Sequence, residues 1–132
     1  MFMLKTDIID LFNAVLNKKL KNFKLTWYKG SAVCAVLTAK GYPGEYEKGK
    51  VIYGLSKPFA RDGLANGVMS FHSGTKLINN KLVTNGGRVL GITVRGKNLR
   101  EAISNTYKHI GKKGINFSGM HYRKDIGRKG LI

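Results

Sequence analysis

Cysteine is almost missing from this sequence, and with it the patterns typical of secreted and zinc-stabilised proteins. The single cysteine, Cys34, cannot form an internal disulfide, and without a second thiol there is no zinc-ligand spacing. No apolar run approaches the length of a membrane span or of a signal-peptide core. We therefore expect a protein of the reducing cytoplasm that does not enter a membrane.

Acidic residues are also scarce. The chain has 7 Asp and Glu against 24 Lys and Arg, which gives a formal net charge of +17. A surface this positive attracts polyanions, so composition alone makes nucleic acid a candidate partner. The lysines are nevertheless scattered from Lys5 to Lys129, with short clusters only at residues 18–21 and 112–113. A lysine-rich solvated surface therefore explains the charge as well as a binding face does.

What remains is an ordinary globular composition. The chain has 132 residues, of which 42% are hydrophobic, enough for one domain with its own core. Short apolar segments separated by glycine and asparagine outnumber helical patterns, which predicts an α+β fold with a mainly antiparallel β-sheet and flanking helices. We divide the chain into a leading helix and strand, residues 1–30, and a domain, residues 31–132.

Two segments have helical periodicity. Apolar residues three and four apart predict an amphipathic helix from Thr6 to Leu20, with Thr6 or Asp7 as its N-cap. A second helix is predicted after Asn98, where Asn98 and Glu101 form a capping-box pattern, and Gly111 can end it in a left-handed conformation.

Strands are predicted in most of the remaining chain. Residues 24–28 and 32–38 are expected to be two strands joined by a tight connection at Lys29 and Gly30. The apolar run Val33–Leu37 is expected to be covered on both faces, which would leave Cys34 inert. The other predicted segments are a short strand at 51–53, an irregular stretch at 56–66, strands at 68–72 and 88–94, a hairpin at 77–83 with its tip at Asn79 and Asn80, and a short strand followed by coil after Gly114.

Three polar segments are candidates for binding. His72, Gly74 and Thr75 lie where a strand ends, a position from which side chains converge on ligands, although a histidine there is often structural. Asn85, Gly86, Gly87 and Arg88 combine paired glycines with an arginine that can hydrogen-bond phosphate through two nitrogens; the alternative is a plain Gly-Gly hairpin with an exposed arginine.

The third segment is the loop that contains Tyr42, Pro43, Gly44 and Lys48, which is either a lid over a small polar substrate or an ordinary ordered loop. The stretch 120–128 is basic and aromatic, a mixture that binds single-stranded nucleic acid, but it matches no RNA-binding module. The three histidines lack the spacing of a metal site, and no catalytic triad pattern is present. We therefore predict no catalytic and no metal-binding residue.

Five motifs occur in the order typical of one family. They are Ala32-Val-Cys-Ala-Val-Leu37, Gly41-Tyr-Pro-Gly-Glu-Tyr-Glu-Lys-Gly49, Phe71-His-Ser-Gly-Thr75, Lys81-Leu-Val-Thr-Asn-Gly-Gly-Arg-Val-Leu-Gly91 and Gly119-Met-His-Tyr-Arg-Lys-Asp-Ile-Gly127. Together they resemble the carboxyl-terminal domain of phosphoribosylamine–glycine ligase, also called glycinamide ribonucleotide synthetase. Residues 4–27 are similar to the helix and strand that lead into that domain.

The resemblance implies a function in purine synthesis. The family enzyme is an ATP-grasp ligase that joins phosphoribosylamine to glycine through an acyl phosphate, with Mg²⁺ neutralising the transferred phosphate. Its last domain closes one side of the active site, and ATP and Mg²⁺ are held by lobes that precede it. The resemblance therefore implies substrate contacts from the three polar segments above, and no ATP or Mg²⁺ site within this chain.

Three interpretations of the chain remain open. It is a fragment or split subunit of the ligase that works with separate ATP-grasp lobes on phosphoribosylamine or glycinamide ribonucleotide; a truncated remnant without function; or a basic module that binds anions or nucleic acid. The excess of basic residues, including Lys50 where the family often has an acid, departs from the family pattern. We do not expect the isolated chain to catalyse ligation.

Overall fold

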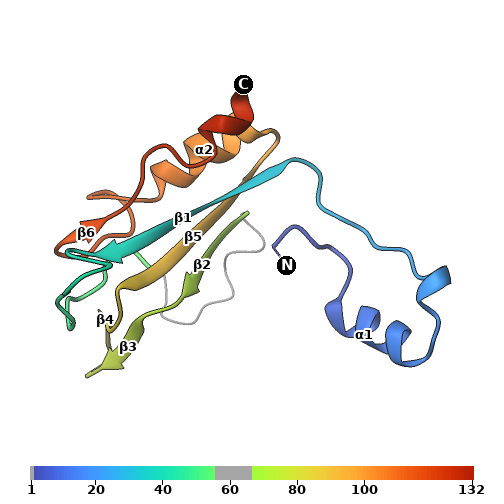
Figure 1. The fold of residues 1–132 in the computed structure, drawn as a ribbon, viewed down its shortest axis with the longest axis horizontal. Coiled ribbons are helices and arrows are strands. Elements are labelled where there is room, and N and C mark those ends of the chain that lie inside the picture. The colour runs from blue at the N-terminus through green and yellow to red at the C-terminus, as the bar shows by residue number, and fades with distance from the viewer. Residues whose placement is uncertain (1, 56–66) are drawn as a thin grey trace.

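A four-stranded antiparallel sheet organises the molecule. The computed structural model describes residues 2–55 and 67–132. The sheet has the order β2-β5-β1-β6, from β2 (Val68–His72), β5 (Arg88–Gly96), β1 (Ser31–Ala39) and β6 (Met120–His121). A separate hairpin consists of β3 (Thr75–Ile78) and β4 (Lys81–Thr84), as Figure 1 shows. The predicted α+β class with a mainly antiparallel sheet is confirmed.

The long strands β1 and β5 form the centre of the sheet because both are rich in β-branched and apolar residues. In their antiparallel register Ala35 lies opposite Ile92 and Leu37 opposite Leu90, and all four side chains are completely buried. Burying side chains of this size contributes roughly 1.5–3 kcal/mol each. A register shift follows Leu37, where β1 approaches its end.

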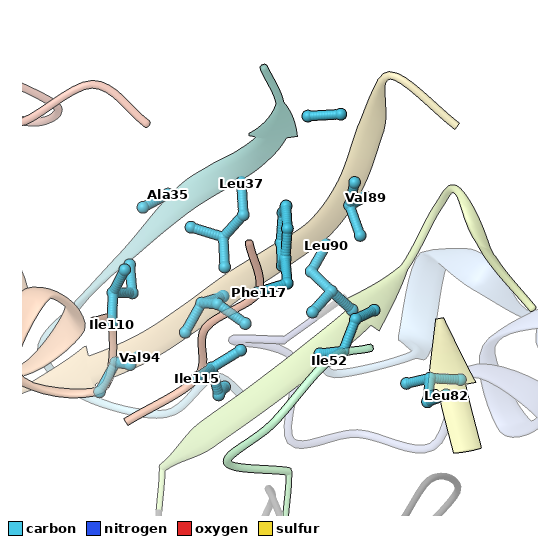
Figure 2. Packing of buried hydrophobic residues seen from close by; sticks show 12 residues of the cluster. Ala35, Leu37, Ile52, Leu82, Val89, Leu90, Val94, Ile110, Ile115 and Phe117 are labelled. Carbon is cyan, nitrogen blue, oxygen red and sulfur yellow. The ribbon is translucent and has the colours of Figure 1, made fainter. Parts of the chain in front are cut away.

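One face of this sheet carries the core. Helix α2 (Leu99–Lys108) packs against β1 and β5, and its buried Thr106 donates hydrogen bonds to the carbonyls of Ala102 (2.7 Å) and Val33 (3.3 Å). Figure 2 shows the core cluster, where side chains from β1 and β5 meet those of the segment after α2. The members of this cluster from outside the sheet are Ile52, Leu82, Ile110, Ile115 and Phe117.

The opposite face of β1 is open, which corrects the expectation that the run Val33–Leu37 is covered on both faces. Buried and exposed residues alternate along β1, so that Ala35 is buried while Cys34 and Val36 are exposed. Successive side chains of a strand point to opposite faces, and the core lies against only one of them. Cys34 is therefore an exposed thiol and not a buried one.

The N-terminal helix is shorter than predicted. Helix α1 (Ile8–Leu16) begins after Asp7, whose carboxylate accepts a hydrogen bond from the Ile9 amide at 2.8 Å. It stops early because Lys18 has a left-handed conformation, with φ of 56°. The short 3-10 helix η1 (Leu20–Asn22) follows.

Residues 24–28 do not form the predicted hairpin with β1. They lie beside the start of the chain, where the Lys5 amide donates to the Thr26 carbonyl and the Tyr28 amide to the Met3 carbonyl, both at 2.9 Å. Between these two segments, Leu4 and Trp27 form an isolated antiparallel bridge. The expected tight connection is wrong because a long-range partner, the N-terminal segment, takes the hydrogen bonds that a local hairpin would have used.

The remaining predictions are mostly confirmed. Strands β2 and β5 and the cap and start of α2 lie where predicted, and Asn79 and Asn80 at the β3–β4 turn have φ of 47° and 57°. The expected strand at 51–53 makes only isolated bridges to Val83 and Asn116. After β6 the tail contains a 3-10 helix, η2 (Arg128–Leu131), where coil was expected. The irregular stretch predicted at 56–66 lies outside the described residues.

Arg95 connects the N-terminal segment to the sheet. Its guanidinium carbon lies 3.9 Å from the centroid of the Tyr28 ring and 5.4 Å from that of Phe2. Each ring belongs to one of the two N-terminal segments that pair with one another.

Within residues 2–55 and 67–132, no helix is long and apolar enough to cross a membrane.

Candidate functional site

Two of the predicted polar segments meet at the start of β5. The turn between β2 and β3 is held against β5 because the amides of Ser73 and Gly74 both donate to the Val89 carbonyl, at 3.1 and 3.2 Å. The Asn85 amide, in the loop between β4 and β5, donates to the Gly74 carbonyl at 2.7 Å. The segments 72–75 and 85–88, which flank the β3–β4 hairpin, thus form one surface.

Glycines make this contact possible. A Cβ atom on Gly74 would lie 2.6 Å from both the Arg88 carbonyl oxygen and the Gly86 Cα, and one on Gly86 would lie 2.9 Å from the Gly74 Cα. Only backbone without side chains fits at these separations. The two glycines therefore have a packing role that the sequence pattern alone did not reveal.

The loop at residues 41–44 joins the same surface from the other side. The Tyr42 ring lies against Gly87, where a Cβ atom would collide with it, and the Ala39 amide donates to the Gly87 carbonyl at 2.8 Å. The Tyr42–Pro43 peptide bond is cis, and Pro43 and Gly44 are exposed. Tyr42 is thereby brought next to the Gly86–Gly87 pair.

The polar side chains of the surface face outward. His72 Nδ1 and Thr75 Oγ1 form a 3.0 Å hydrogen bond, while the side chains of Asn85 and Arg88 are exposed to solvent. Partial burial lowers the pKa of His72 below its ordinary value because a charged imidazolium loses hydration there. At neutral pH the surface thus presents a neutral imidazole beside the cationic Arg88.

The second half of the loop is held against β4. The Gly49 amide donates to the Thr84 carbonyl at 2.7 Å, and the Lys50 amide donates to Thr84 Oγ1 at 3.1 Å. The Lys50 ammonium lies 2.6 Å from a Glu47 carboxylate oxygen, and this hydrogen bond lowers the pKa of Glu47. Lys48, which is exposed, directly precedes the two residues that hydrogen-bond to Thr84.

A cavity of about 640 Å³ adjoins this surface on the inner side of the loop. None of the predicted site residues is among the described residues that line it, which are Ala39, Lys40, Gly41, Glu45, Tyr46, Glu47, Lys50, Thr84, Phe117, Ser118 and Gly119. The sequence signal that could have indicated part of this lining is the acidic-basic alternation from Glu45 to Lys50. Nothing local indicated residues 117–119, because the tail reaches the loop only through the pairing of β6 with β1.

Comparison with known proteins decides what kind of domain this is. The sequence model of the family described as "Phosphoribosylglycinamide synthetase, C domain" matches residues 32–129. The chain belongs to this family. The resemblance seen in the five motifs is thereby confirmed.

Curated relatives of this C domain agree. The chain is 45% identical over 130 residues to the phosphoribosylamine–glycine ligase of Synechocystis sp., a match that covers 98% of the chain and 29% of the relative. It is 44% identical over 124 residues to the ligase of Caldanaerobacter subterraneus, covering 94% and 28%. The chain is also 45% identical over 130 residues to the chicken trifunctional purine biosynthetic protein adenosine-3, a match that covers 98% of the chain and 12% of the relative.

The fold agrees as well. The crystal structure of the phosphoribosylamine–glycine ligase of Thermotoga maritima matches with a TM-score of 0.63 and 34% sequence identity, covering 87% of this chain and 27% of that one. The chain therefore spans less than a third of the length of the ligases that it matches.

The basic and aromatic tail, residues 120–128, makes contacts within the chain. In the basic tail, Tyr122 stacks on Tyr107 with ring centroids 6.2 Å apart, and Arg123 makes two hydrogen bonds to Asp125 at 2.9 and 2.6 Å. This pairing raises the pKa of Arg123 and lowers that of Asp125. The side chains of Tyr122 and Arg123 are thus engaged within the chain.

The described part of the C domain contains no cluster of side chains that could bind a metal ion. Residues 2–55 and 67–132 contain no group of three His, Cys, Asp or Glu side chains placed to hold a metal ion. The phosphate-binding Gly-Lys-Ser/Thr loop pattern also does not occur in the sequence.

Proposed function

We propose that this C domain forms the substrate-facing wall of a phosphoribosylamine–glycine ligase. The observation that carries the proposal is the convergence of the segments 42–44, 72–75 and 85–88 at the start of β5, in a chain of this family. In the complete ligase, ATP and Mg²⁺ held by ATP-grasp lobes would supply the phosphoryl transfer. This domain binds and orients the ribose-phosphate substrate.

Each group has a role that its chemistry supports. Arg88 is exposed, permanently charged, and able to donate two parallel hydrogen bonds to a phosphate or carboxylate. The Gly86 and Gly87 amides approach the same anion, and Asn85 offers a donor and an acceptor. His72 and Thr75 orient hydroxyl groups, because a neutral imidazole hydrogen-bonds without adding charge.

The 41–49 loop closes this site from its outer side. Tyr42 supplies a flat apolar surface next to Gly87, Pro43 and Gly44 shape the turn, and Lys48 adds a second cation. Gly74 contributes by allowing the turn after β2 to approach Gly86. None of these groups is assigned to bond making, so the isolated chain is expected not to ligate.

Calorimetric titration of the purified chain with glycinamide ribonucleotide, in moderate salt, tests the proposal. We expect saturable binding that Arg88→Ala weakens at least tenfold, because the substrate phosphate loses its charge-assisted partner. Arg100→Ala is the matched control: it removes the same charge from an exposed position at the start of α2 and should change the affinity less than twofold. Equal affinities of wild type and Arg88→Ala would refute the site.

The net charge of +17 favours one other candidate, a module that binds polyanions. Such a module would bind a random oligonucleotide with an affinity that falls linearly with salt on logarithmic axes. Arg88→Ala and Arg100→Ala would then weaken oligonucleotide binding equally, since each removes one charge. This pattern, without binding of glycinamide ribonucleotide, would replace the ligase proposal.

A further inference from the structure

Helix α1 turns its apolar side to solvent. The predicted amphipathic pattern is present, yet Phe12 is 55% exposed and Leu16 is 79% exposed. Three further large apolar side chains nearby are also exposed. We define the α1 apolar surface by Ile9, Phe12, Val15, Leu16 and Leu20.

In the part of the chain that the structure describes, the side chains of this surface remain exposed. Figure 1 shows α1 apart from the sheet, joined to it through the N-terminal segment and the chain that leads into β1. Among the described residues, α1 packs mainly against η1, whose Leu20 belongs to the same exposed set. The polar residues Asp10 and Asn13 form a polar side of the helix that borders this surface.

A surface of this kind requires an explanation. Helices of about 9 residues are marginal in water, and an amphipathic helix gains its stability from burial of the apolar side. A contiguous cluster of large exposed apolar side chains typically marks an interface. The physical question is therefore which molecule covers the α1 apolar surface.

Relatives of the chain indicate the occupant. The C-domain model begins at residue 32 and leaves α1 outside, but the Synechocystis ligase aligns with 130 residues of this chain and so includes the helix. That ligase is more than three times as long as the match, which covers 29% of it. A helix that precedes the C domain in such proteins has a large additional section of polypeptide available to pack against.

Charge disfavours a second copy of the chain. Lys18, Lys19 and Lys21 follow the helix after its C-cap Asn17 and flank Leu20 in the chain, and the chain as a whole carries +17. Two copies packed through α1 would bring these lysines towards one another, and like charges oppose association. A partner with acidic groups around an apolar centre suits the surface better.

We propose that the α1 apolar surface docks the remaining section of a phosphoribosylamine–glycine ligase, through an apolar face bordered by acidic residues. The inference rests on the proposed function for the identity of the partner. In this proposal α1 binds the remaining section of the ligase, and the substrate-facing loops at the start of β5 do not.

Direct binding tests the proposal. The probe is the Synechocystis ligase from which the matching 130 residues have been deleted, and the titrated protein is the full chain. We expect saturable binding that Phe12→Asp weakens at least tenfold, because it places a charge in the apolar centre. Asn13→Asp adds the same carboxylate to the polar side of α1 and should change the affinity less than threefold. Binding that is insensitive to Phe12→Asp would overturn the proposal.

A second measurement avoids dependence on the folding of the deleted ligase. In a chimera, the full chain replaces the matching 130 residues of the intact Synechocystis ligase. Hydrogen exchange at the α1 amides should be at least a hundredfold slower in the chimera than in the chain alone, because a packed helix opens rarely. Phe12→Asp should abolish the difference and Asn13→Asp should preserve it. Equal exchange in chimera and isolated chain would overturn the proposal.

Three outcomes distinguish this inference from the alternatives. Self-association of the chain that Phe12→Asp abolishes, seen by sedimentation at rising concentration, would assign the surface to a second copy and overturn the proposal. If the probe binds through α1 but glycinamide ribonucleotide does not bind, the docking surface stands and the proposed substrate site fails. If the nucleotide binds through Arg88 and the probe does not bind, the docking surface fails alone.

Discussion

The glycines at the candidate site show how a single residue can have two explanations. Paired glycines suggest anion binding, and the amides of Gly86 and Gly87 retain that role in the proposed site. The structure adds that Gly74 and Gly86 touch through their backbones. Loss of the close contact between Gly74 and Gly86 would separate the segment that carries His72 from the segment that carries Arg88. Packing and binding therefore depend on the same two glycines.

Gly74→Ala tests the packing role. The new methyl group would lie 2.6 Å from the Gly86 Cα and the Arg88 carbonyl oxygen, so the loops must move apart. We expect the free energy of unfolding, measured in urea, to fall by about 1–3 kcal/mol. Ser73→Ala changes an exposed neighbour and should stay within about 0.5 kcal/mol of wild type. Similar effects of both substitutions would contradict the packing role.

His72 should make stability depend on pH. Its pKa is lowered in the folded protein by burial, so the unfolded chain binds a proton more readily. Stability from the neutral imidazole is fully present above the unfolded pKa of about 6.5 and is lost as pH falls through the lower folded pKa. His72→Gln should flatten the unfolding free energy in urea over this acidic window. An unchanged pH profile would show that His72 does not titrate in this way.

At the scale of elements, α2 is specified by its own ends. The Asn98 carboxamide oxygen accepts from the Glu101 amide at 2.9 Å, and the Glu101 carboxylate accepts from the Lys97 amide at 3.0 Å. This is the predicted capping box with its second bond shifted by one residue. Because the helix covers β1 and β5, its cap also secures the core.

Asn98→Ala should remove this cap. Losing a side-chain N-cap costs about 1 kcal/mol, since the Glu101 amide is left without its partner. We expect a lower thermal midpoint by circular dichroism. Ser104→Ala, at an exposed position in the middle of α2, should leave the midpoint unchanged or raise it slightly, because alanine favours helix. A larger loss from the Ser104 change would be inconsistent with the capping argument.

At the scale of the whole molecule, the N-terminal segments and the sheet are joined at Arg95. The guanidinium lies near the rings of Phe2 and Tyr28, which come from the two N-terminal segments that pair through backbone hydrogen bonds. This contact holds the stem of α1 beside the sheet. It thus connects the docking surface with the strand β5 that also carries Arg88.

Arg95→Ala should loosen this connection. Cation–π contacts contribute roughly 0.5–1 kcal/mol each, so amides in residues 3–6 and 26–28 should exchange several-fold faster while those of β1 remain protected. Arg95→Lys keeps the charge and should lie between wild type and alanine. Uniform acceleration across β1 and the N-terminal segments would indicate global destabilisation instead.

Local sequence patterns were enough for the elements whose determinants lie within a few residues. Apolar spacing indicated α1, asparagines indicated the β3–β4 turn, and Asn98 with Glu101 indicated the start of α2. The five ordered motifs indicated the family, which the match to residues 32–129 confirmed. These features survive because backbone preference and side-chain periodicity act over short distances.

Tertiary structure alone decided which surfaces are covered and which distant segments meet. No local pattern could show that one side of β1 is open at Cys34, or that the apolar side of α1 faces solvent. The pairing of residues 24–28 with the N-terminal segment depends on contacts between parts of the chain separated by about twenty residues. The approach of Gly74 to Gly86 depends on the register of the β3–β4 hairpin between them. The hydrophobic effect is non-directional, so an apolar residue in the sequence indicates that burial is favourable but not which surface buries it. The three-dimensional arrangement determines that surface.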